Sequence, residues 1–188
     1  MDILKISLVN LPGIHSGLLA NIIRREKLGS CKAISSSSSL DYFTGDIECT
    51  NFIIFYDKNI SEEDVMLLKA PKEIPVILIT ENSSFEMERT AKSNNIDLVI
   101  NASDPELVAL IYGFISQYQV YQSQHVLIVD DSRVDSYIMT NILTKDFLYN
   151  DNEHNPENVI DLLTNSETIN IIILDYEMPQ KNGCQLMK

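Results

Sequence analysis

Residues 170–183 read NIIILDYEMPQKNG, and this stretch decides the fold. Its four large apolar residues form a run typical of a buried parallel strand, and the run ends at Asp175. A second run, HVLIVDD at 125–131, ends in the same way at Asp130 and Asp131. In an open parallel sheet, binding sites form outside the carboxyl ends of the strands. If the two strands are neighbours, as a doubly wound order makes them, their three acids converge.

The chain contains an internal repeat with an offset of 120 residues. Residues 5–24, KISLVNLPGIHSGLLANIIR, align with residues 125–144, HVLIVDDSRVDSYIMTNILT. Ser16 then aligns with Ser136, and later segments follow in the same order. A repeat of this length predicts a duplicated domain.

The first copy alternates apolar runs with stretches of helical periodicity. The runs typical of strands lie at 4–9, 31–34, 52–56, 74–79 and 96–100. Five strands joined by crossovers predict an α/β fold with a doubly wound, open, parallel five-stranded sheet. In the last helix, Asp104 is expected as the cap and Pro105 in the first turn. An apolar stripe on that helix is expected to be core: Leu107, Leu110, Ile111, Phe114, Ile115 and Tyr118.

The second copy begins in the same way, with a strand at 125–129, a helix from about 132 and a strand at 171–174. Since it stops after this third strand, we expect an open apolar sheet edge and a chain that is a fragment of a longer protein. The predicted domains are a complete first copy at 1–118, a linker or helix extension at 119–124, and the N-terminal half of a second copy at 125–188.

Composition excludes several functions. The formal net charge of -13 argues against nucleic acid or an anionic membrane surface as a direct partner, because both require a basic face. No apolar stretch has the length of a membrane span, and no export signal is present. We therefore expect a soluble cytoplasmic protein. The cysteines are expected to be reduced thiols, and they are Cys31, Cys49 and Cys184. The histidines are expected at solvent-facing or turn positions, and they are His15, His125 and His154.

Three carboxylates in one small volume call for a shared cation, because like charges repel. Mg²⁺ suits the arrangement, since it prefers oxygen ligands and leaves positions for phosphate oxygens. Taken one at a time, Asp130 or Asp131 could instead cap the following helix, and Asp175 could be a turn residue. The combination and order of all three favour the metal site.

The segments HVLIVDDSR and IIILDYEMPQKNG resemble the flavodoxin-like receiver domain of two-component response regulators. The resemblance implies that Asp175 is the phosphoacceptor and that Mg²⁺ is the cofactor. It also implies that Asp131 is a direct ligand, that Asp130 acts through water, and that Glu177 contributes its backbone carbonyl. The family uses a hydroxyl residue and a lysine after its fourth and fifth strands. The second copy has neither, so it is expected to hold the ion but to be phosphorylated poorly.

The first copy has the layout of the same family without its active-site chemistry. Asn10 and Leu11 stand where the second copy has its acid pair. The acceptor position falls on Tyr56 if Asn51 aligns with Asn170, and otherwise on Asp57. The hydroxyl position is kept at Thr80, while the lysine position falls on Asn101 or Ala102. We therefore interpret this copy as a degenerate receiver that is kept for dimerisation, partner docking or restraint of its neighbour.

These features indicate a tandem pair of receivers in two-component signal transduction. The expected partner is a histidine kinase or a phosphotransfer protein, and a homodimer is left open. The portion is not expected to be an enzyme itself, although the full-length protein could carry a catalytic output such as a diguanylate cyclase. Two alternatives are a phosphatase of the haloacid dehalogenase type and a scaffold that is never phosphorylated.

Overall fold

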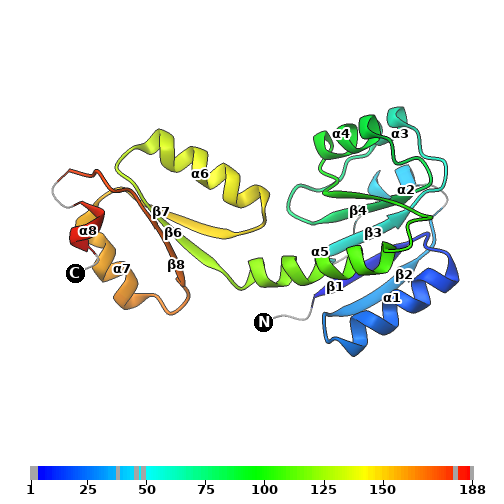
Figure 1. Cartoon of the computed structure of the whole chain (residues 1–188), viewed down its shortest axis with the longest axis horizontal. Helices are drawn as coiled ribbons and strands as arrows, with labels where there is room; N and C mark the ends of the chain where they lie inside the picture. Colours follow the sequence, from blue (N-terminus) through cyan, green and yellow to red (C-terminus); the bar gives the residue numbers. More distant parts are fainter. Residues whose placement is uncertain (1–3, 37–38, 45–46, 48–49, 180–181, 187–188) are drawn as a thin grey trace. The chain divides into compact units, whose positions relative to one another are not determined.

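The structure, a computed structural model, describes the chain except for residues 1–3, 37–38, 45–46, 48–49, 180–181 and 187–188. The chain divides into two compact units, unit 1 over Met1–Ser116 and unit 2 over Gln117–Lys188 (Figure 1). Helix α5, Leu107–Gln122, runs across this division. Most of the segment at 119–124 is therefore a helix extension. Among the described residues, no helix is both long enough and apolar enough to cross a membrane.

Unit 1 is built on a parallel five-stranded sheet with the order β2-β1-β3-β4-β5. Figure 1 shows α1 and α5 on one side of this sheet and α2, α3 and α4 on the other. The predicted doubly wound α/β fold is confirmed. The strands are β1 Lys5–Val9, β2 Ser30–Ile34, β3 Phe52–Tyr56, β4 Val76–Thr80 and β5 Leu98–Asn101, and the further helices are α1 Gly13–Arg25, α2 Ser39–Thr44, α3 Glu62–Leu67 and α4 Phe85–Ser93.

Burial in unit 1 follows strand position. The inner strand β4, VILIT, is buried along its whole length, whereas the edge strand β2, SCKAI, has no buried residue. A strand covered by helices on both faces needs apolar residues at every position, and an edge strand does not. The predicted stripe of α5 is buried at Leu107, Ile111 and Ile115, but the prediction for Leu110 is wrong, because 41% of its surface is exposed.

Unit 2 contains a parallel three-stranded sheet with the order β7-β6-β8. The strand β7 was not predicted from the sequence. Its residues, YNDNE, are polar, and none of them is buried. Main-chain hydrogen bonds to β6 hold this strand in the sheet, and such bonds leave no periodic pattern in the residues. The elements are β6 His125–Val129, α6 Arg133–Lys145, β7 Tyr149–Glu153, the 3₁₀ helix η1 Pro156–Asn158, α7 Val159–Asn165, β8 Ile171–Leu174 and α8 Gly183–Leu186.

The same pair of hydrogen bonds precedes the third strand in both units. In unit 1, Lys5 N donates to Asn51 Oδ1 at 3.1 Å, and Asn51 N donates to the Lys5 carbonyl at 2.9 Å. In unit 2, His125 N donates to Asn170 Oδ1 at 3.0 Å, and Asn170 N donates to the His125 carbonyl at 3.1 Å. Asn51 is therefore the counterpart of Asn170.

This correspondence places Tyr56, not Asp57, at the position of Asp175. The strand registers agree, because Val9 pairs with Phe55 in unit 1 and Val129 pairs with Leu174 in unit 2. The residue that follows each pair is the one at the tip of its strand. The open choice between Tyr56 and Asp57 is thereby decided in favour of a tyrosine, which carries no carboxylate.

Strand β8 pairs with β6 alone among the described residues. Its side chains remain partly in solvent, with Ile171 39% and Ile172 44% exposed. The open apolar edge that the sequence predicts is thus present in the structure. An edge of this kind is a template for pairing with another strand.

The prediction for His125 is wrong. Its side chain is buried, with Nδ1 2.8 Å from Thr168 Oγ1 and Nε2 2.9 Å from Asp151 Oδ2. A polar side chain at the start of a buried strand is tolerated because both ring nitrogens have partners. Cys31 and Cys184 are free cysteines, and Cys49 lies outside the described residues.

The environment of Asp97, the residue just before β5, is expected to make the stability of the protein depend on pH. Its Oδ2 accepts a hydrogen bond from Val76 N at 2.8 Å. Burial of this carboxyl raises its pKa from 3.8 to about 6, although hydrogen bonds to the backbone act in the opposite direction. The folded state therefore binds the proton more tightly than the unfolded state. The stability from this group is complete below pH 3.8 and is lost as the pH rises through about 6.

The variant Asp97→Asn keeps an acceptor for Val76 N and removes the charge. Between about pH 5 and about pH 8, the wild type is expected to lose about 1 kcal/mol of unfolding free energy relative to this variant. The effect is limited because the carboxyl group is buried only in part and the rest of the residue is exposed to solvent. Denaturant unfolding at both pH values measures the difference. The exposed Glu88→Gln serves as the control, and equal pH dependence in wild type and Asp97→Asn would contradict the expectation.

Candidate metal site

Asp130, at the carboxyl end of β6, is fixed by hydrogen bonds to its side chain and to its main chain. Only 4% of its surface is exposed. Its Oδ1 accepts a hydrogen bond from Ser132 N at 2.8 Å, and its own N–H donates to the Glu153 carbonyl at 3.2 Å. Its carbonyl oxygen accepts from the buried Ser136 hydroxyl at 3.4 Å and lies 2.8 Å from His154 Nδ1. The carboxylate therefore has a defined position at the strand tip.

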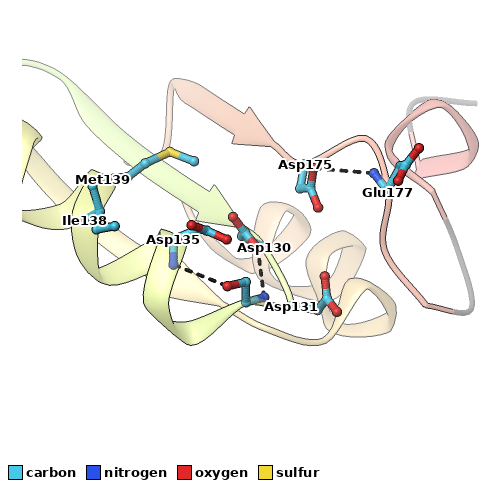
Figure 2. A pocket seen from close by; sticks show the side chains of 8 residues that line it. Asp130, Asp131, Asp135, Ile138, Met139, Asp175 and Glu177 are labelled. Atoms are coloured by element: carbon cyan, nitrogen blue, oxygen red, sulfur yellow. Dashed lines mark hydrogen bonds between the residues drawn. The ribbon is translucent and has the colours of Figure 1, made fainter.

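Asp131 and Asp175 complete a cluster around that position. Asp131 is exposed, and Asp175, at the tip of β8, is half-buried. Asp175 N donates to the Val129 carbonyl at 2.9 Å, which continues the ladder between β8 and β6. Each of the three acids offers a carboxylate oxygen, and these oxygens all lie within 4.8 Å of one another. The predicted convergence of Asp130, Asp131 and Asp175 is present in the structure (Figure 2).

The cluster opens into a cleft of about 670 Å³. Glu177 lies at its wall, and its N–H donates to Asp175 Oδ1 at 3.4 Å (Figure 2). Sequence reasoning missed Asp135, whose only signal is its place one helical turn after Asp131. The lining residues are Asp130, Asp131, Ser132, Asp135, Ile138, Met139, Asp175 and Glu177.

The loop after Asp175 is shaped by Met178 and Gly183. Met178 is buried against Leu127 and Val129 of β6 in the small core of unit 2. A Cβ added to Gly183 would lie 2.7 Å from the Asp175 carbonyl oxygen and 3.1 Å from a Leu174 side-chain carbon. Glycine is therefore required by the close approach of α8 to the tip of β8.

The donor set fits a small divalent cation. Three carboxylates at this separation repel one another by roughly 1 to 3 kcal/mol per pair, depending on the surrounding dielectric. A shared cation removes that repulsion, and hard oxygen donors favour Mg²⁺ over metals that prefer sulfur or imidazole ligands. The residues that would hold the ion are Asp130, Asp131 and Asp175, with Glu177 beside them.

Unit 1 has no such cluster at the equivalent edge among the described residues. Asn10 takes the place of Asp130, and its Oδ1 accepts a hydrogen bond from Ser36 N at 2.8 Å. Leu11 and Tyr56 replace the other two acids. None of these three side chains carries a negative charge, so the edge lacks the ligands that Mg²⁺ prefers.

Comparison with solved structures identifies the fold. A putative two-component system response regulator/GGDEF domain protein matches with a TM-score of 0.69 and 19% identity, over 97% of this chain and 75% of that chain. A probable two-component system response regulator/GGDEF domain protein matches with a TM-score of 0.68 and the same identity and coverage. No protein-family model and no curated protein matches the chain. The chain therefore has the fold of two-component response regulators, and at this identity the likeness concerns the fold alone.

Proposed function

We propose that the chain is a signalling protein with tandem receiver domains, in which the second receiver accepts a phosphoryl group on Asp175 with the help of Mg²⁺. The observation that carries the proposal is the convergence of three carboxylates, within 4.8 Å of one another, at the tips of two paired strands. The fold that the solved response regulators share supports it.

Each side chain has a role in this proposal. Bound Mg²⁺ supplies positive charge for the oxygens of the phosphoryl group during transfer. Asp130 and Asp131 would hold the ion, the buried Asp130 through water and the exposed Asp131 directly, and Glu177 would contribute its carbonyl. Asp175 presents a carboxylate oxygen to phosphorus and becomes an acyl phosphate. The proposed donor is a phosphohistidine on a histidine kinase or phosphotransfer protein.

The first receiver, residues 1–118 by the boundary expected from the sequence, is the degenerate receiver of the pair and contains unit 1. Its strand tips carry Asn10, Leu11 and Tyr56 in place of the acids. A regulatory or dimerising role fits this lack of ligands. A GGDEF-type output, as in the names of the two matched proteins, is the proposed target of the signal.

Binding of Mg²⁺ tests the site directly. Mn²⁺ serves as a paramagnetic probe that is expected to broaden the amide NMR signals of residues 130–132 and 175–177, and added Mg²⁺ is expected to reverse the broadening. In Asp131→Asn the apparent affinity is expected to fall at least about tenfold, because one of three carboxylates is lost.

The matched control is Asp161→Asn, which removes the same charge from an exposed position on α7 outside the cleft. Its affinity is expected to remain that of the wild type. If both variants lose affinity for the ion equally, binding reflects only the general attraction between an acidic surface and a cation, and the proposal fails.

A further inference from the structure

Thr80, at the carboxyl end of β4 in unit 1, is the centre of a hydrogen-bonded connection between loops. Its side chain is fully buried. The hydroxyl donates to the Lys58 carbonyl at 3.5 Å and accepts from Asn82 N at 3.1 Å. Glu81 N also donates to the Lys58 carbonyl, at 3.3 Å. The loop after β3 is thereby joined to the loop after β4.

The loop after β5 is joined to the same place. Asn101 Nδ2 donates to Ser83 Oγ at 2.9 Å and to the Glu81 carbonyl at 3.4 Å. Asn82 Nδ2 donates to the Ile60 carbonyl at 3.4 Å. Side chains of unit 1 itself therefore link all three loops that follow β3, β4 and β5.

An ion pair adds to these links. Lys58 Nζ lies 3.5 Å from Glu81 Oε1, and the side chains are 57% and 52% exposed. Lys58 is the counterpart of Glu177, because Tyr56 and Asp175 correspond and each stands two residues earlier. A surface pair of this kind contributes little, so the buried Thr80 hydroxyl is the more important member.

We propose that unit 1 is a permanently closed module, in which hydrogen bonds centred on Thr80 hold the three loops in one arrangement without an ion or a phosphoryl group. The two sheet edges then behave differently. At the sheet edge of unit 2, three acids lie close together and need an external cation. At the sheet edge of unit 1, amide, hydroxyl and ammonium groups of the protein itself join the loops. The proposal does not require that unit 2 binds metal.

The consequence is a constant surface at the starts of α3 and α4. Ser84, which caps α4, follows directly after the linked residues Glu81–Ser83, and the next residue, Phe85, is 74% exposed. A surface that does not change with the signal suits a regulatory or assembling module better than a switch.

Amide hydrogen exchange on the 188-residue chain tests the closed state. Thr80→Val keeps the shape and removes the hydroxyl, so the exchange at Asn82 and Glu81 is expected to become about tenfold faster. The control Thr90→Val makes the same change on α4, where the Thr90 hydroxyl makes no hydrogen bond to a loop within the described part of the chain. Exchange at Glu81 and Asn82 is expected to be unchanged in this variant. Unchanged exchange in Thr80→Val would overturn the proposal.

A second variant covers the case in which Thr80→Val does not fold. Asn101→Ala removes the link to Ser83 without touching the groups that Glu81 N and Asn82 N donate to. If the links act together, exchange at those two amides is still expected to rise about threefold or more. If only Ser103, which donates to Asn101 Oδ1, exchanges faster, the links are independent and the proposal fails.

Addition of Mg²⁺ with beryllofluoride to the wild type provides the third measurement. Exchange at Glu81 and Asn82 is expected to stay constant at saturating concentrations, and a slower rate would show that unit 1 closes on a ligand. Exchange at residues 130–132 reports separately on unit 2. A response of neither unit contradicts the function proposed for unit 2 and supports the closed state of unit 1, so the two failures are distinguishable.

Discussion

Replacement of Asp175 by asparagine is expected to abolish phosphoryl labelling of the protein. Asparagine has nearly the same shape and can still accept the hydrogen bond from Glu177 N, so the loop is expected to keep its position. The variant lacks the nucleophilic carboxylate oxygen and one of three charges beside the ion. Labelling by acetyl phosphate with Mg²⁺, followed by intact mass, is expected to fall at least about 100-fold.

The label in the wild type is expected to be released by hydroxylamine, as acyl phosphates are. The reaction is run on the protein as it occurs naturally. Asp57→Asn is the matched control in unit 1, since Tyr56 and not Asp57 occupies the acceptor position there. A label that survives Asp175→Asn, or is lost in Asp57→Asn, would assign the acceptor to another residue.

Replacement of Gly183 by alanine is expected to destabilise unit 2 by about 1–3 kcal/mol. The added methyl group meets the Asp175 carbonyl oxygen at 2.7 Å, and this oxygen belongs to the backbone. Relief of the contact requires movement of the segment that carries Asp175 and Glu177. We therefore expect weaker binding of Mg²⁺ together with the loss of stability, measured by denaturant unfolding and by metal titration.

Gly113→Ala is the internal control for this experiment. Gly113 lies within α5, and a Cβ there meets no atom within 4 Å. Alanine is favoured over glycine inside a helix, so this variant is expected to gain up to about 1 kcal/mol. Equal effects at the two positions would show that helix propensity, and not the contact with Asp175, determines the result at Gly183.

The sequence predicted correctly those features of the fold that depend on consecutive residues. The apolar runs of β6 and β8 both form strands, β6 buried and β8 partly exposed at its open edge, and each ends on its acid at the same edge of the sheet. A parallel strand covered on its faces must be apolar at successive positions, so its pattern is visible without any partner. The repeat was visible for the same reason, because two copies of one fold need similar residues at their strands.

Polar elements were harder to predict. Strand β7 has no apolar run, and its place beside β6 comes from main-chain hydrogen bonds that any residue except proline can make. The burial of His125 also depends on Thr168 and Asp151, which are distant in the sequence and cannot be predicted from a local pattern. Both were missed because long-range contacts, not periodicity, stabilise them.

The sequence by itself determined the fold class, the repeat and the three acids of the cleft. A strand appears in the sequence as a run of consecutive apolar residues, and the residue at its tip is the one that follows the run. Only the tertiary structure decided that Tyr56 is the counterpart of Asp175, that Asp135 faces the same cleft, and that Gly183 is needed for a close approach. These three facts depend on register and on contacts between separate segments. Such contacts exist only once the chain has folded.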